Sequence, residues 1–284
     1  MYQTMKITGT LVLLLAASYT RGQSLRDADY YATYAFTSIT DTTELTYTNP
    51  VPFVLIGFGE ESVFCASNSH FNDSMRYDYF VSRPALGSYE SRADNDAARA
   101  DYMSRRSAWK KSTVVNYRVR KDFREGTFAN SLIFAFPPQH FEGSLSLPWQ
   151  LTADRDTIQG LPCQMATVSY GHRNYRVWFT PAISINDGPY VFSGLPGMIV
   201  KVTDDRSWYE FLLTDLTVAP RQVFYNERFI NPTSQAVSRK TYVDFQRRRK
   251  GSPRLIGVDN DDEERMLKAK KNFLWRFFML IEDY

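Results

Sequence analysis

Three histidines and two cysteines are the residues of this 284-residue chain best suited to nucleophilic or metal chemistry. His70, His140 and His172 lie far apart and form no His-Glu-x-x-His pair, the spacing that places two zinc ligands on one face of a helix. The sequence also contains no Gly-x-Ser-x-Gly turn, no glycine-rich phosphate loop and no catalytic cysteine signature. It therefore predicts no catalytic residue, no metal site and no cofactor.

The alternative is an envelope hydrolase whose site assembles only in three dimensions. A pocket with His140 or His172 within hydrogen-bonding reach of a Ser, an Asp or a metal would favour it, whereas three exposed, scattered histidines would dismiss it. Asp204 and Asp205 are adjacent carboxylates, but neighbours on a strand point to opposite faces. A solvated turn is therefore expected there, rather than a shared acid-base pair.

Residues 1–22 have the pattern of a secretory signal peptide, with Lys6 before the apolar run Leu11–Ala17 and small residues at its end. Cleavage is expected after Gly22. The apolar run is much shorter than the span of about 20 residues that a membrane helix needs, and no other segment could cross a bilayer. Because the first cysteine is Cys65, the end of the leader offers no thiol for a lipid. The mature chain is expected to be periplasmic or secreted.

The two cysteines leave two alternatives open in that compartment. A disulfide between Cys65 and Cys163 would close a long loop, which is worth about 4 to 5 kcal/mol in the chain-entropy model. Two small buried side chains are the other alternative. Spacing alone does not place the Cα atoms within the roughly 7 Å that a disulfide requires.

Composition bounds both the partners and the fold. The formal net charge is +3, and Lys6 and Arg21 of the leader supply two of these charges, so the mature chain is nearly neutral and has no basic field for nucleic acid. Apolar residues make up 43% of the chain, enough for a sizeable core. The 20 Phe, 18 Tyr and 5 Trp favour strands over a helical bundle.

Runs of β-branched and aromatic residues, bounded by turn residues and without a βαβ rhythm, recur from Val51 onward. They predict strands over 51–58, 62–66, 75–81, 113–120, 127–136, 157–170, 174–180, 197–203, 208–216 and 222–229. The expected fold is mainly β: one domain over 23–284 with a large curved antiparallel sheet or half-open barrel.

Two stretches predict helices. Residues 92–108 hold alanines among charges and are expected to cover one side of the sheet. Residues 261–280 begin with acids and continue with lysines, and their apolar side chains fall near one face. Docking of that face on the sheet is favoured over a helix lying on a membrane surface.

An ordered series of motifs over residues 149–216 is similar to that of a known protein family. Its centre is Gly194-Leu-Pro-Gly-Met-Ile199, preceded by motifs over 149–152, 158–166 and 173–181. In this series the chain resembles the GLPGLI family, secreted proteins of Bacteroidetes-type bacteria named for that hexapeptide. Met198 replaces the usual leucine, a swap of similar volume, and the C-terminal tail departs from that of the family. The resemblance implies export without an assigned activity; Cys163 falls at the usual cysteine position of the family, and Cys65 does not.

The glycines and prolines of the signature have two interpretations. Pro196 fixes φ and Gly197 supplies a positive φ, which predicts a type II turn over Leu195–Met198. Asp187-Gly-Pro189 predicts a second chain reversal. The alternative interpretation is that Gly194 and Gly197 let the backbone approach a ligand or partner closely.

Strand 174–180 adds a clue because Tyr175, Val177 and Phe179 share one face, whereas Arg176 and Trp178 lie on the other. An aromatic ring and an arginine on a nominally wet face either line a groove or are covered by a helix. The candidate residues for binding a ligand or partner are Arg173, Arg176, Trp178, Asp187, Gly188, Gly194, Pro196 and Gly197. Arg173, beside His172, is expected as a turn charge rather than a phosphate clamp.

The sequence thus predicts an exported, non-enzymatic envelope protein that binds an apolar ligand or a peptide on the concave face of its sheet. The hydrolase remains one alternative. Another is an interaction module that docks on an outer-membrane partner through an exposed sheet edge.

Overall fold

The computed structural model describes residues 23–41, 46–47, 49–81, 91–107, 117–132, 139–226, 234–242 and 244. The predicted leader, residues 1–22, and the predicted helix 261–280 lie outside these residues. Among the described residues, no helix has both the length and the apolar character needed to span a bilayer.

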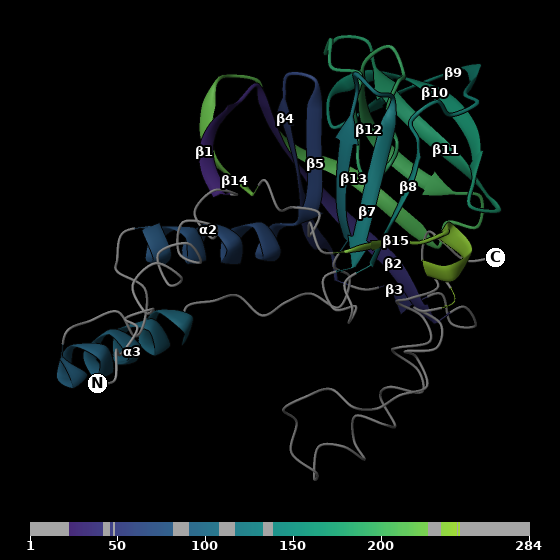
Figure 1. The fold of residues 1–284 in the computed structure, drawn as a ribbon. Helices are drawn as coiled ribbons and strands as arrows, with labels where there is room; N and C mark the ends of the chain where they lie inside the picture. The colour runs from purple at the N-terminus through teal and green to yellow at the C-terminus, as the bar shows by residue number, and fades with distance from the viewer. Residues whose placement is uncertain are drawn as a thin grey trace.

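Most strands belong to one large curved sheet, and its order in space is β15-β8-β7-β6-β5-β4-β2-β13-β12-β11-β10-β9, with β3 paired to β2 (Figure 1). The strands are β2 (Tyr30–Asp41), β3 (Thr46–Tyr47), β4 (Val51–Phe58), β5 (Glu61–Ala66), β6 (Tyr117–Asp122), β7 (Thr127–Leu132), β8 (Gln139–Ser144), β9 (Gln150–Ile158), β10 (Leu161–Tyr170), β11 (Arg173–Thr180), β12 (Met198–Asp204), β13 (Tyr209–Thr217) and β15 (Gln235–Ala236). Neighbouring strands run antiparallel except for the parallel pair β15 and β8. In the described part of the chain β9 and β15 end the sheet without pairing to each other, so the mainly β prediction is confirmed as an open sheet, not a closed barrel.

A second, two-stranded sheet of β1 (Gln23–Ala28) and β14 (Arg221–Asn226) covers part of the outer face of the large sheet. Its residues Ala28, Val223 and Tyr225 pack with Val54 and Ile56 of β4 in a separate apolar cluster. This second layer explains why β4 is a continuous apolar run, since its inward side chains join the main core while its outward ones are covered as well.

Residues 75–81 correct one prediction, because they form part of the helix α2 (Ser67–Val81) and not a strand. Tyr and Phe favoured a strand there, but α2 follows β5 directly and packs against β4, β5 and β14. An ion pair of 2.5 Å between Asp73 of α2 and Arg118 of β6 anchors it. Tertiary docking therefore overrides the local β preference.

The helix predicted over residues 92–108 is confirmed as α3 (Arg92–Ser107), and the Oγ of Ser91 accepts a hydrogen bond of 3.0 Å from the backbone N–H of Asp94 at its start. Its expected position is wrong. Figure 1 shows α2 against the lower ends of the strands, whereas α3 lies farther from the sheet. Of the two helices α2 and α3, it is α2 that packs against strands.

The connection between β11 and β12, residues 181–197, folds against the inner face of the large sheet. Tyr190, Phe192 and Leu195 of this connection are buried in the main core with residues of both halves of the sheet. The ring of Phe192 lies 4.9 Å from that of Tyr175 on β11. The chain itself therefore fills the inner face at this point, where the sequence predicted a concave binding surface.

Candidate functional site

A groove of about 400 Å³ crosses the face of the large sheet opposite the main core. We call it the outer groove. Its lining side chains come from β2, β10, β11, β12, β13 and the turn before β13, and they are Thr37, Met165, Arg176, Trp178, Lys201, Thr203, Ser207 and Glu210.

Strand register explains how residues far apart in the sequence meet in the outer groove. Side chains that face one another on adjacent strands form rows across the sheet. One row consists of Thr167, Arg176, Thr203, Glu210 and Thr37. The parallel row begins with Met165, Trp178 and Lys201. Arg176 and Trp178 alternate on β11 with buried Tyr175, Val177 and Phe179, so the predicted faces of this strand are confirmed.

The outer groove carries more positive than negative charge. Lys201 and Glu210 form an ion pair of 2.9 Å and are 31% and 33% exposed. The guanidinium of Arg176 donates a hydrogen bond of 3.3 Å to the Oγ of Ser207, and none of the carboxylates in the described part of the chain pairs with it. The groove therefore offers an arginine with available N–H donors beside the half-buried indole of Trp178.

Of the sequence-predicted candidates, the structure brings together Arg176 and Trp178 but not Arg173. Arg173 pairs with Asp204 at 3.1 Å, with its guanidinium 4.9 Å from the ring centroid of Tyr209. Asp204 is fully buried and accepts backbone hydrogen bonds from Trp208 (2.6 Å) and Tyr209 (3.0 Å). The expected solvated turn is thus wrong for Asp204, which holds the hairpin between β12 and β13, and right for exposed Asp205.

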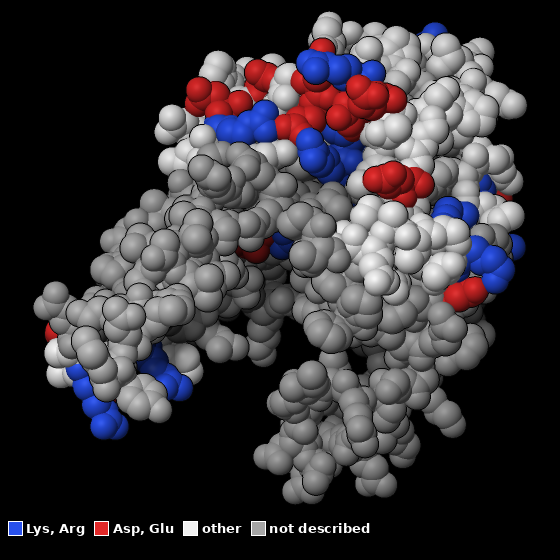
Figure 2. Space-filling view, in the orientation of Figure 1, with Lys and Arg blue, Asp and Glu red and all other residues white. Residues whose placement is uncertain are grey.

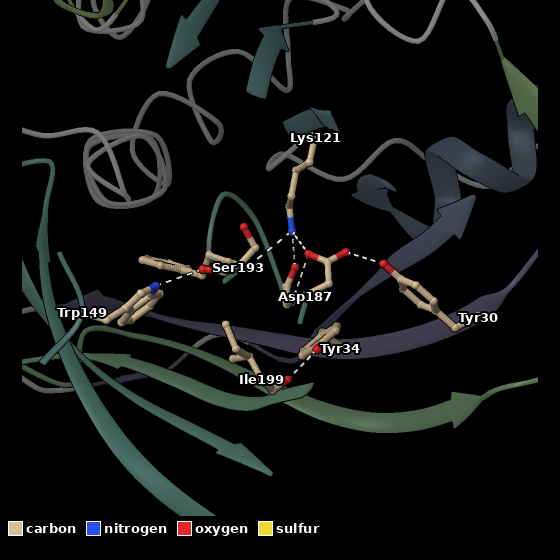
Figure 3. Close-up of polar contacts among 9 residues, drawn as sticks. Tyr30, Tyr34, Lys121, Trp149, Asp187, Ser193 and Ile199 are labelled. Atoms are coloured by element: carbon tan, nitrogen blue, oxygen red, sulfur yellow. Dashed lines mark hydrogen bonds and ion pairs between the residues drawn. The ribbon is translucent and has the colours of Figure 1, made fainter. Parts of the chain in front are cut away.

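Asp187 and Gly188 belong to a buried polar network, shown in Figure 3. The Nζ of Lys121 contacts Oδ1 of Asp187 and donates a bond of 2.5 Å to the carbonyl of Gly188. The hydroxyl of Tyr30 donates a bond of 2.6 Å to Oδ2 of Asp187. Burial lowers the pKa of Lys121, and the carboxylate of Asp187 opposes this effect. The network anchors the inner connection, so these two candidates are structural.

Gly197 favours the geometric interpretation of the signature. Its φ is +143°, and an added Cβ would lie 2.1 Å from the carbonyl oxygen of Thr180. The close approach is therefore to the chain itself. The predicted type II turn is wrong: the N–H of Gly197 donates to the carbonyl of Leu195 (2.8 Å), a tighter turn around Pro196, and the N–H of Met198 donates to Ile183 (3.1 Å).

Gly194 and Pro196 are exposed parts of the same connection. Gly194 has a φ of +86°, and its N–H donates to the carbonyl of Asn186 (3.0 Å). Nearby, the indole of Trp149 donates to the carbonyl of Ser193 at 3.0 Å (Figure 3). Neither candidate lines the outer groove.

The cysteines are free and buried in different clusters. Cys65 lies in the apolar cluster between β4 and the two-stranded sheet, and Cys163 lies in the main core. The alternative of two small buried side chains therefore describes this structure. Burial raises the pKa of Cys65 to about 12, so this thiol is a poor nucleophile.

The histidines do not converge. Burial lowers the pKa of His70 to about 4, and its ring lies 6.2 Å from Tyr31 and 6.3 Å from Phe224. His172 is exposed in the turn between β10 and β11. The described residues contain no group of three His, Cys, Asp or Glu side chains that could hold a metal ion.

His140 has the hydrogen-bond partner that the hydrolase alternative requires, but it lines neither the outer groove nor the hollow around Glu61. Its Nδ1 lies 2.7 Å from the Oγ of Ser234, and its Nε2 lies 3.6 Å from an oxygen of Glu142. Sequence reasoning missed Ser234, which is 94 residues away and gains this contact only because β15 pairs with β8.

A second hollow, of about 300 Å³, lies where the ends of several strands gather acidic and basic side chains in the upper part of Figure 2. Its three arginines are all paired with glutamates. Glu61 pairs with Arg26 and with Arg120 and accepts a bond of 3.0 Å from the hydroxyl of Tyr225, while Glu60 pairs with Arg124. The charged groups of this hollow are thus largely engaged with one another. It therefore offers a ligand fewer available hydrogen-bond donors than the outer groove does.

Comparisons with known proteins find a family match and several similar solved structures. Residues 150–201 match the model of a family described as "Protein of unknown function (Porph_ging)", which is consistent with the expected Bacteroidetes-type family. No curated protein matches.

Two of the similar solved structures are titled "Structure of PNGF-II in P21 space group" and "Structure of PNGF-II in C2 space group". Their TM-scores are 0.47 and 0.46, each at 11% identity over 77% of this chain. The match spans only 33% and 32% of those chains.

Proposed function

We propose that this chain is an exported, non-enzymatic protein of the GLPGLI type that binds a ligand in the outer groove. Export is supported by the pattern of residues 1–22, and cleavage after Gly22 would leave β1 intact because this strand begins at Gln23. The family assignment is supported by the motif series over 149–216 together with the match over residues 150–201.

One observation carries the binding proposal: Arg176, whose one side-chain hydrogen bond within the described part of the chain goes to Ser207, shares a groove on the sheet with half-buried Trp178. Sites built on strands hold their side chains more firmly than sites on loops. The inner face offers less room because residues 181–197 occupy it. An outward arginine and an indole beside hydroxyl groups are typical of a surface that binds a ligand or a protein partner.

Saturation-transfer NMR on the purified chain beginning at Gln23 tests this proposal with a library of fatty acids, short peptides and oligosaccharides. We expect at least one class to bind, and we expect Trp178→Ala and Arg176→Gln each to remove the signal at a temperature where the variant is folded. Arg155→Gln, at an exposed position on β9, is the matched control. A library without a binder, or binding that survives both groove variants, would overturn the proposal.

A second candidate function rests on the short contact between His140 and Ser234. A serine beside a histidine that is itself near a carboxylate is the minimum arrangement for an activated nucleophile. A fluorophosphonate probe tests this candidate. Labelling that disappears in both Ser234→Ala and His140→Ala would favour a hydrolase, and the absence of labelling would favour the binding proposal.

The third candidate, docking through a sheet edge, is disfavoured at β9. This edge strand is exposed along most of its length and carries Asp154, Arg155 and Asp156. Charges on an edge strand hinder the addition of another strand. Co-purification from envelope extracts with the chain intact would test this candidate.

A further inference from the structure

We infer that the outer groove recognises a saccharide that carries a carboxylate. The inference rests on the proposed binding function of this groove and adds the chemical class of the ligand. It follows from which ligand groups can find hydrogen-bond and charge partners in the groove and which cannot.

The lining disfavours an acyl chain. Six of the eight lining side chains are polar or charged, and only Met165 and Trp178 are apolar. A hydrocarbon laid across the groove would cover hydroxyl and charged groups without giving them hydrogen-bond partners, which is unfavourable. Pockets for apolar ligands are lined mainly by apolar side chains.

The position of the groove disfavours an extended peptide. Peptides that bind to sheets usually do so at an edge, where the backbone groups of the peptide pair with the free backbone groups of the edge strand. The groove lies over β11 and β12, and each of these strands is paired on both sides. A peptide backbone lying there would find only side chains as partners, so its amide groups would be poorly satisfied.

A saccharide suits the same lining. Its ring presents a weakly apolar C–H face and a rim of hydroxyl groups that both donate and accept hydrogen bonds. Half-buried Trp178 offers an aromatic surface for the C–H face. Around it, Thr37, Ser207 and Glu210 provide the donors and acceptors that hydroxyl groups need.

The charge of the groove favours an acidic sugar. Glu210 is the only acid in the lining, and it already pairs with Lys201. Among the described residues, the side chain of Arg176 donates a hydrogen bond to the neutral Oγ of Ser207 alone, so its planar guanidinium retains donors for a carboxylate. An arginine binds a carboxylate through two parallel hydrogen bonds, which are stronger than bonds between neutral groups.

Isothermal titration calorimetry on the chain beginning at Gln23 tests the inference with three probes: trigalacturonate, an alginate trimer and a hyaluronan tetrasaccharide. The methyl esters of the same sugars are the matched ligands without charge. We expect at least one acid to bind about tenfold more tightly than its ester, since a hydrogen bond to a charged group is worth more than one to a neutral group. Raising the salt concentration should narrow the difference.

The variants separate charge from stacking. Arg176→Gln should bring the affinity for the acid down to that for the ester. Trp178→Ala should weaken acid and ester alike, and Arg155→Gln should change neither. Arg176 and Arg155 are exposed, so the melting temperatures of their variants should stay close to that of the unchanged chain. Trp178 is partly buried and packs against the main core, so Trp178→Ala should melt at a lower temperature, and its affinities are measured well below that temperature.

Three outcomes would overturn the inference. If an ester binds as tightly as its acid, the groove does not recognise the carboxylate. Binding of hexaglutamate or decanoate in place of every sugar, with Trp178 still required, overturns the sugar assignment and leaves the proposed function intact. No binding by any of these probes or by the NMR library overturns both.

Discussion

Lys121 and Asp187 form an ion pair that solvent does not reach, with side chains 0% and 2% exposed. Lys121 lies on β6 and Asp187 lies in the connection between β11 and β12, so the pair joins one half of the sheet to the segment that fills its inner face (Figure 3). The hydroxyl of Tyr30 completes the contact from β2. A buried pair of this kind fixes the position of the connection because neither charge tolerates the loss of the other.

Removal of one partner of this pair should destabilise the fold strongly. Lys121→Met leaves the carboxylate of Asp187 buried without its cation, and the free energy of unfolding should fall by about 3 to 5 kcal/mol. Urea denaturation measures this loss. Lys201→Met is the control because its pair with Glu210 is about one-third exposed and should cost at most about 1 kcal/mol. Equal losses in the two variants would contradict the account.

Stability should depend on the protonation of His70. Its pKa is about 4 in the folded chain against 6.5 for the free group, so the unfolded chain binds more protons between these values. The free energy of unfolding should therefore fall as the pH drops from about 6.5 to 4, with a contribution of about 3 kcal/mol from this residue. His70→Phe keeps a ring between Tyr31 and Phe224 and should lose this component in denaturation at several pH values. An unchanged slope in the variant would argue against it.

Gly197 should tolerate no side chain. Gly197→Ala forces a Cβ against the carbonyl of Thr180 at a φ that L residues rarely adopt. Gly160→Ala is the matched control because this glycine also has a positive φ, +75°, but has nothing within 4 Å of the added Cβ. Thermal denaturation should show that the variant at 197 loses about 1 to 3 kcal/mol more than the one at 160, because overpacking is added to the backbone strain that both share. Similar losses would contradict the close approach described above.

The two thiols should react only after unfolding. Cys65 and Cys163 are free and buried, so a maleimide should label neither in the native protein and both in guanidinium, as intact mass would report. Because no disulfide contributes, reducing agent should leave the melting temperature unchanged. A native mass two hydrogens lower, or a melting temperature that falls with reducing agent, would show a bridge instead.

Much of the sheet follows from local patterns. The alternation on β11 predicts that Tyr175, Val177 and Phe179 face the core and that Arg176 and Trp178 face outward, and each residue lies as predicted. The strand β2 has the same signal, since Tyr30, Ala32, Tyr34 and Phe36 are buried at every second position, yet the predicted strands began only at Val51. The pattern of β2 therefore indicates a strand as clearly as that of β11.

Other features depend on contacts that no local pattern contains. Aromatic residues in 75–81 indicated a strand, and only the docking of α2 on β4, β5 and β14 makes the helix favourable. Lys121 and Asp187 are 66 residues apart, and nothing in either neighbourhood indicates the other. The remaining residues of the outer groove, such as Lys201 and Glu210, join Arg176 through strand order and register, which the sequence does not specify.

The most direct test of the account is NMR titration of the indole N–H resonance of Trp178, assigned by its absence in Trp178→Phe. We predict that a uronate oligosaccharide shifts this resonance together with backbone amides of β10 to β13, and that Arg176→Gln reduces the shift. A ligand whose perturbations fall instead on the connection over residues 181–197, with Trp178 unmoved, would contradict the outer groove as the site of binding.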